Sequence, residues 1–148
     1  MRNKLVARGQ LSIETLLIAA ALLAFLAFLL PVASKVFDSL RAHSVESGQQ
    51  AVFDEILFKA REASLLGPGT RFSLNPWFEA DSIISFDHSS NQLKLDYWFA
   101  GKKNSLQANL STRLFISPAL SSNLSSGKYS LYLYNNGSGI VFSGQKQS

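Results

Sequence analysis

The chain has 148 residues, of which 47% are hydrophobic and 16% are charged, and it contains no cysteine. This length allows one domain of ordinary size, or a smaller domain with one additional element. The absence of cysteine excludes disulfide bonds, thiolate metal sites and a cysteine nucleophile. The small share of charged residues is typical neither of a disordered polyelectrolyte nor of a nucleic-acid-binding tail.

Charge and hydrophobicity are both concentrated near the N-terminus. Arg2, Lys4 and Arg8 have no acidic residue beside them, and removing them from the 14 basic residues leaves 11 against 10 acidic ones, a net charge of +1. Residues 16–33 read LLIAAALLAFLAFLLPVA, in which only Pro31 is not hydrophobic. The basic pI and the high apolar content therefore belong to a targeting and membrane segment rather than to the folded domain.

The apolar run predicts a membrane-spanning helix. It carries no charge and is about as long as a bilayer requires. Eleven of its residues are Leu, Ile, Phe or Val, which favour insertion by roughly 3 to 7 kcal/mol in total. Basic residues before the run and mixed charge after it place the N-terminus in the cytoplasm and the rest of the chain outside. A buried core helix is the alternative, but little else in so short a chain could cover it.

The sequence leaves three hypotheses for this segment. The first is a simple anchor that is retained, and the second is a signal peptide that is removed by cleavage after Ser34. In the third, the chain is cut on the cytoplasmic side of the helix. Secretory cleavage has support, because a basic region, an apolar region and Val32-Ala33-Ser34 follow one another. It does not explain Glu14, since a carboxylate at the mouth of an apolar helix is costly and usually has a partner or a function.

Residues 8–14, RGQLSIE, resemble the archaeal class III signal peptide, a variant of the type IV prepilin signal. The family pattern has Gln, Ser and Glu at alternating positions before a hydrophobic helix, and here these are Gln10, Ser12 and Glu14. Ile18 stands where the pattern usually has leucine. The close resemblance covers about the first 35 residues, and beyond them only the architecture of one long helix and a small β domain.

This resemblance implies that a prepilin peptidase cuts between Gly9 and Gln10, so that residues 1–9 are lost and the apolar helix is retained. Glycine before the cut would let an extended backbone enter the protease site without a side chain. In the family, the Glu14 carboxylate would pair with the new α-amino group of Gln10 in a neighbouring subunit and fix the axial register. A solvated Glu14 at the headgroup boundary is the alternative. Pro31 lies where type IV pilins often have a helix-bending proline.

Residues 10–66 are predicted to form one long N-terminal helix. After Pro31 the apolar residues recur at three- and four-residue steps with charges between them, as in an amphipathic helix. Unbroken, this helix would measure about 85 Å. Gly67-Pro68-Gly69 predicts its end. Gly48 is its weak point, where a break or bend is expected to be easiest, because glycine costs about 1 kcal/mol inside a helix.

Residues 67–148 are predicted to form an extracellular domain with five or six short antiparallel strands. Alternating patterns occur at 82–86, 93–99, 106–116, 129–134 and 140–142, with turns at 87–91 and 101–104. Asn136-Gly137 predicts a type I′ hairpin. The fold class is therefore α+β, in which the second half of the long helix covers one face of a small antiparallel sheet.

Asn109, Asn123 and Asn136 each begin an N-glycosylation sequon in this domain, although Asn and Ser are also common in turns. No cofactor, metal site or catalytic group is predicted. His43 and His88 lack further ligands, and adjacency of Asp87, His88 and Ser89 in sequence does not make a triad. Lys102-Lys103 predicts a solvated turn rather than a nucleic-acid site. Core packing is favoured over a carbohydrate-binding face for the remaining aromatic candidates, Trp77, Phe78, Trp98 and Phe99.

The resemblance therefore implies a pilin, a structural subunit of an archaeal type IV pilus-like filament involved in surface attachment. Its partners would be copies of itself or other pilins, a prepilin peptidase, a membrane platform protein and an assembly ATPase. Membrane lipid would surround the helix before assembly. Major, minor and pseudopilin roles are not distinguished by the sequence. The alternative is a membrane-anchored or secreted β-domain protein that binds a ligand or carbohydrate and does not polymerise.

Overall fold

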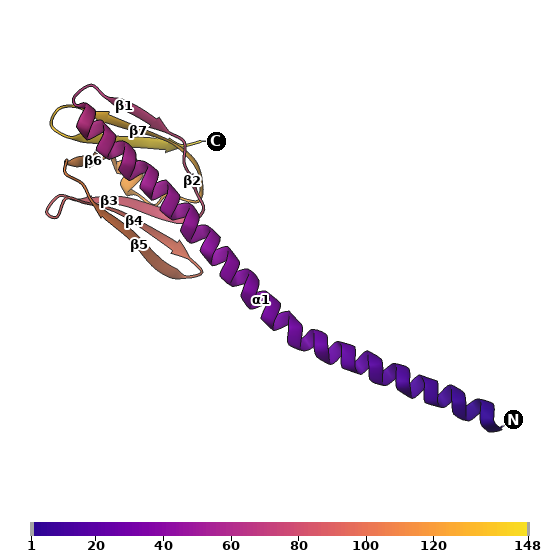
Figure 1. Cartoon of the computed structure of the whole chain (residues 1–148). Coiled ribbons are helices and arrows are strands. Elements are labelled where there is room, and N and C mark those ends of the chain that lie inside the picture. Colours follow the sequence, from indigo (N-terminus) through magenta and orange to yellow (C-terminus); the bar gives the residue numbers. More distant parts are fainter. Residues whose placement is uncertain (1, 148) are drawn as a thin grey trace. The chain divides into compact units, whose positions relative to one another are not determined.

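The computed structural model describes the backbone of residues 2–147 and the side chains of residues 13–147. The chain divides into two compact units, Met1–Arg41 and Ala42–Ser148. Helix α1 spans Arg2–Leu66 and contributes to both units (Figure 1). It ends at the predicted residue because Gly67 adopts φ +84°, a left-handed conformation that is open to glycine and stops an α-helix.

Two residues that disfavour a helix interior lie within α1. In the first unit the helix continues through Pro31, where the missing N–H leaves the carbonyl of Ala27 without its usual helical partner. In the second unit it continues through Gly48 without a break. An added Cβ at Gly48 would lie 2.7 Å from Oε1 of Glu79. The glycine therefore leaves room for the loop between two strands to approach the helix.

The second unit is α+β, as predicted, with two sheets rather than one. In chain order its elements after α1 are β1 (Arg71–Leu74), β2 (Trp77–Phe78), β3 (Asp81–Asp87), β4 (Gln92–Phe99), β5 (Lys102–Asn109), β6 (Leu114–Ile116), the short helix α2 (Pro118–Ser121), β7 (Gly127–Asn135) and β8 (Ile140–Lys146). One sheet has the order β1-β7-β8-β6, with β2 also paired to β7, and the other has the order β3-β4-β5. All pairs are antiparallel except β6 with β8.

The predicted single strand at 106–116 is wrong. Strand β5 ends at Asn109, and the chain crosses to the other sheet before β6 begins at Leu114. Leu110, at the crossing, is buried and donates its backbone N–H to the carbonyl of Asn91. Inward residues keep the same parity on both sides of the crossing, from Leu106 to Ile116. The alternating pattern therefore gives no sign of the change of sheet.

Two predicted turns also differ in detail. The β4–β5 hairpin turns on Ala100 and Gly101 alone, both at positive φ, so that β5 already begins at Lys102. The type I′ turn predicted at Asn136-Gly137 is wrong, because four residues separate β7 from β8 and only Gly137 among them has positive φ. The Asn136 side chain stabilises this longer loop, since its Oδ1 accepts hydrogen bonds from the N–H groups of Ser138 and Gly139.

The second half of α1 covers both sheets on one face (Figure 1). Its buried side chains follow a helical spacing, and Ala60 and Ala63 are fully buried. They share one core with inward side chains from both sheets, including Ile84, Leu95, Leu131 and Phe142 on β3, β4, β7 and β8. The predicted role of this half-helix as the cover of the sheet is therefore confirmed.

Two buried amides attach the helix to the strands. The Gln49 side chain is fully buried, and its amide oxygen accepts hydrogen bonds from the backbone N–H groups of Ala80 (2.9 Å) and Glu79 (3.1 Å). Near the end of the helix, Nδ2 of Asn135 donates to the carbonyl of Ala63 at 2.8 Å. That carbonyl is one of the four at a helix C-terminus that lack a helical partner. The two contacts are 14 residues apart, about 21 Å along the helix.

We expect Gln49→Met to lower the free energy of unfolding by about 2 to 4 kcal/mol, because a similar volume is kept while the backbone N–H groups of Glu79 and Ala80 lose their acceptor. Urea unfolding of the full chain in detergent micelles, followed by tryptophan fluorescence, measures this loss. Gln50→Met is the matched control, since Gln50 is exposed and bonds only to Asp54. Equal stability of the two variants would contradict the role given to Gln49.

Candidate functional site

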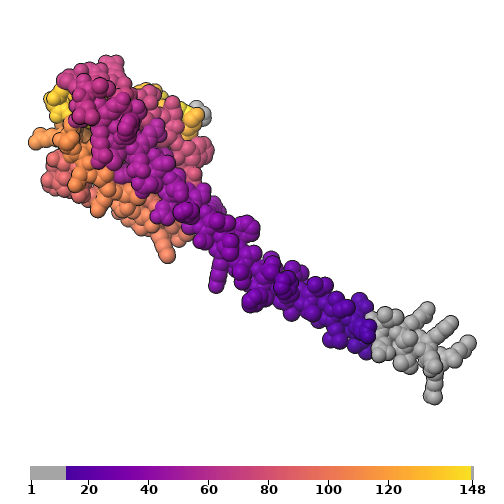
Figure 2. Space-filling view, in the orientation of Figure 1, coloured from indigo at the N-terminus to yellow at the C-terminus, as the bar shows by residue number. Residues whose placement is uncertain are grey.

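The first unit carries an exposed apolar helix surface. Every side chain from Ile13 to Val32 is exposed, including Phe28 at 73% and Leu23 at 68% (Figure 2). Among the described residues, α1 is the one helix that is long and apolar enough to cross a membrane, with a mean hydropathy of 2.8 over its most apolar window. No part of that window is buried by the rest of the chain. A patch this large exceeds what a soluble monomer exposes, so lipid or other protein has to cover it.

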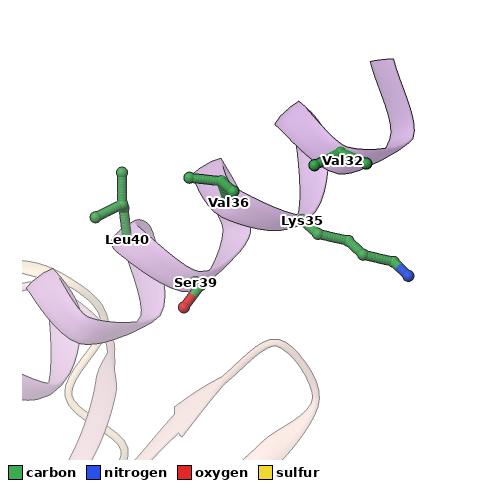
Figure 3. A pocket seen from close by; sticks show the side chains of 5 residues that line it. All are labelled: Val32, Lys35, Val36, Ser39 and Leu40. Carbon is green, nitrogen blue, oxygen red and sulfur yellow. The ribbon is translucent and has the colours of Figure 1, made fainter. Parts of the chain in front are cut away.

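The exposed apolar surface continues beyond the predicted membrane run. Val36, Phe37 and Leu40 are between 53% and 70% exposed. Val32, Val36 and Leu40 follow each other at four-residue steps, and Figure 3 shows them with Lys35 and Ser39 along the same stretch of helix. These five residues line a shallow concave surface to which only α1 contributes. The apolar surface of the first unit is thus longer than the uncharged run alone.

Of the residues predicted to direct cleavage and assembly, Glu14 and Pro31 have described side chains. No side chain is described for residues 1–12, which include the positions Gly9, Gln10 and Ser12. Glu14 is exposed and forms no ion pair with any side chain in residues 13–147. Pro31 lies inside α1 at the apolar run. The predicted cleavage site and the predicted pairing of Glu14 with Gln10 therefore stay predictions.

The three sequon asparagines are all exposed. Asn109 ends β5, Asn123 follows α2, and Asn136 lies in the β7–β8 loop. Oδ1 of Asn136 accepts two backbone hydrogen bonds, and its Nδ2, the atom that carries an N-linked glycan, takes part in neither. Exposure is a requirement for glycosylation at each site, and glycosylation itself stays a prediction.

Asp87 and His88 contact neighbouring side chains in a turn, and His43 is exposed to solvent. Asp87 accepts hydrogen bonds from the hydroxyl groups of Ser89 and Ser90 and from the Ser89 N–H, and these bonds hold its pKa well below the ordinary value. His88 lies edge-on to the ring of Phe86, and its ring centroid is 5.9 Å from that of Phe115. Asp87, His88 and Ser89 thus form a turn at the end of β3.

His43 is exposed on α1. Within residues 13–147 no cluster of His, Asp or Glu could hold a metal ion.

The four aromatic candidates separate by strand face. Phe78 is fully buried in the core and Phe99 is partly buried, which fits the predicted core packing. Trp77 is 60% exposed and Trp98 37% exposed, so the prediction of core packing is wrong for these two. Nζ of Lys103 lies 5.6 Å from the Trp98 ring and forms an ion pair with Asp96 at 2.8 Å. Burial raises the pKa of Asp96, but hydrogen bonds from Lys103 and Ser105 outweigh it, and the pKa is lowered overall.

The chain was also compared with known proteins. No protein-family model matches it, and neither a curated protein nor a solved structure matches it significantly.

We expect the double variant Leu23→Arg/Phe28→Arg to leave the membrane fraction after carbonate extraction. Each substitution changes the free energy of insertion by about 3 to 4 kcal/mol, and together they cancel the roughly 3 to 7 kcal/mol that the apolar run supplies. The control Phe37→Arg/Leu40→Arg makes a comparable change just beyond the run and should stay with the membranes. Retention of both variants would mean that residues 16–33 do not anchor the chain.

Proposed function

We propose that this chain is a type IV pilin-like structural subunit of an archaeal surface filament. The observation that carries the proposal is an uncharged, fully exposed apolar helix that begins directly after the Gln10, Ser12 and Glu14 pattern. A helix of this kind suits two successive environments, the bilayer before assembly and the apolar core of a filament afterwards. In this reading the second unit is carried on the outside, where it mediates attachment.

Before assembly the subunit would be a single-pass membrane protein with a cytoplasmic N-terminus. Charge supports this orientation, because Arg2, Lys4 and Arg8 precede the apolar run and the residues after it carry both signs. A prepilin peptidase would then remove residues 1–9, and a platform protein and a cytoplasmic ATPase would drive extraction from the membrane. No cofactor enters this scheme.

The length of the exposed apolar surface supports the filament stage. Residues 16–33 span about 27 Å, which matches a hydrocarbon core of about 30 Å. The exposed apolar surface from Ile13 to Leu40 spans about 42 Å, which lipid alone would not cover unless the helix were strongly tilted. Helices of neighbouring subunits could cover the remainder, including Val36, Phe37 and Leu40. The apolar surface is longer than the bilayer requires, and this favours a helix that is partly covered by other protein over one that only anchors the chain in lipid.

Glu14 is the residue that would set the register between subunits. It is the one carboxylate between the leader and the end of the apolar run, and an unpaired charge among apolar helices costs several kcal/mol. A new α-amino group on Gln10 of an adjacent subunit would neutralise it at one axial offset. Such a pair favours one alignment over others more than it adds to total stability.

Processing is the first test of the proposal. N-terminal sequencing of the protein isolated from its native membranes should give Gln10 as the first residue. Gly9→Val should block the cut and leave the leader in place, because the added side chain occupies the protease site. A mature chain that begins at Lys35 would show ordinary secretion, and an intact N-terminus would show a simple anchor. Either result would favour the alternative, a non-polymerising protein with an outer β domain.

Assembly is the second test. We expect Glu14→Gln to reduce the yield of filaments at least tenfold, because the charge is lost while the size and polarity of the side chain are retained. The yield is measured by electron microscopy and blotting of material sheared from the cell surface. Asp38→Asn removes a carboxylate from an exposed site on the same helix after the apolar run and should have little effect. Normal filaments from Glu14→Gln would argue against register pairing.

A further inference from the structure

The face of the five-stranded sheet turned away from α1 carries exposed aromatic side chains. Residues directly paired across strands share a face of a sheet. Tyr134 pairs with Arg71 on β1 and with Val141 on β8, and Val141 pairs with Phe115 on β6. Their sequence neighbours on the strands, such as Leu133 and Phe142, are buried under α1. We call the outward surface of this sheet the outer face.

The remaining residues of the outer face follow from the same register. The second row joins Ser73, Tyr132 and Ser143, and Ser130 and Gln145 form the next pair along β7. At the far end Trp77 pairs with Lys128. Trp77, Tyr132, Tyr134 and Phe115 are between 38% and 60% exposed. Four aromatic rings therefore lie on one surface, along about 20 Å of β7.

The outer face carries a small positive charge, and its charged groups lie far apart. Arg71 and Lys128 are its two cations, and the paired positions include no carboxylate. The Arg71 guanidinium lies over the Tyr134 ring, 4.9 Å from its centroid, which is within the range of a cation–π interaction. Neither cation forms an ion pair with a described side chain. The two charges stand near opposite ends of the aromatic row.

Polar groups between the rings are already oriented by one another. Nε2 of Gln147 donates to Oγ of Ser130 at 2.6 Å and to Oδ1 of Asn75 at 3.0 Å, and the Ser130 hydroxyl lies 3.3 Å from the same Asn75 oxygen. This triad lies between Trp77 and Tyr132 along the sheet. Aromatic rings alternating with hydroxyl and amide groups complement sugar rings, whose C–H faces stack on aromatic rings and whose hydroxyls need hydrogen-bond partners.

The other sheet of a second copy would offer this surface no carboxylate that is free of intramolecular partners. The corresponding surface of the other sheet holds Asp81, Asp87 and Asp96, and all three carboxylates are already engaged. Asp81 accepts from the N–H of Ser126, Asp87 from Ser89 and Ser90, and Asp96 pairs with Lys103. A single-stranded nucleic acid also fits poorly, because it requires cations along the whole backbone rather than two that stand about 20 Å apart.

We propose that the outer face binds an acidic polysaccharide, a chain of neutral sugars with interspersed carboxylates. Sugar rings stack on Trp77 and Tyr132, Arg71 and Lys128 each bind one carboxylate, and the Asn75, Ser130 and Gln147 triad binds hydroxyls between them. Binding requires only the second unit. It is therefore independent of whether the chain forms filaments, and it gives the proposed attachment role a ligand of defined chemistry.

The test is isothermal titration of the full chain in detergent micelles with hyaluronan oligosaccharides, in which uronic acid alternates with a neutral sugar. Chito-oligosaccharides of the same length are the neutral comparison. We expect binding of the acidic chain to be at least tenfold tighter than that of the neutral chain and to weaken as salt is raised. Tyr132→Ala and Arg71→Gln should each weaken binding of the acidic chain at least tenfold.

Two variants on the other sheet are the matched controls. Trp98→Ala and Lys103→Gln remove an exposed ring and a cation from its outward surface, and both should bind as the unchanged protein does. Circular dichroism should show that all four variants are folded, because each replaced side chain lies outside the core. The proposal would be overturned by absence of binding, by equal binding of neutral chains, by loss of binding in the controls, or by preferential binding of a single-stranded oligonucleotide. Self-association that Arg71→Gln abolishes would also overturn it.

Discussion

The physical constraint on which the rest of this molecule depends is the apolar surface of the first unit. Residues 16–33 expose hydrocarbon on every side of a helix, and Val36, Phe37 and Leu40 extend that surface further. Exposure of this surface to water is unfavourable, because burial of each large apolar side chain lowers the free energy by about 1.5 to 3 kcal/mol. The first unit therefore carries a candidate membrane span, and its apolar surface requires a partner other than water.

The second unit has a hydrophobic core of its own. The half-helix 42–66 supplies one side of its core, and strands from both sheets supply the other. Gln49 and Asn135 attach that half-helix at two points through buried hydrogen bonds, and removing either would leave buried polar groups unpaired. The domain thus contains its own covering helix and needs no disulfide bond to close the core.

Local patterns predicted much of this fold, and non-local pairings explain what they missed. The end of α1 was predictable because Gly67 and Pro68 act on the backbone nearby, and the strands near 82–86 and 93–99 were predictable from alternation. The crossing after Asn109 was not, since the parity of inward residues is the same in both sheets. The role of Gln49 depends on Glu79 and Ala80, thirty residues away. At the candidate site, the exposed apolar run was evident from composition. The outer face was not, because β1 and β7 pair across about sixty residues of chain.

Strand β7 contributes to the core with one face and to the outer face with the other. Its inward residues, Leu131 and Leu133, are completely or almost completely buried beneath the helix, whereas the alternate residues Tyr132 and Tyr134 face outward. A substitution at an inward position opens a cavity in the core, while one at an outward position changes only the surface that a ligand meets. Because the strand is central to its sheet and hydrogen-bonded on both sides, the outward rings are held at fixed spacing without a ligand. Substitutions on such a surface can therefore change which ligand it binds without disturbing the core beneath it.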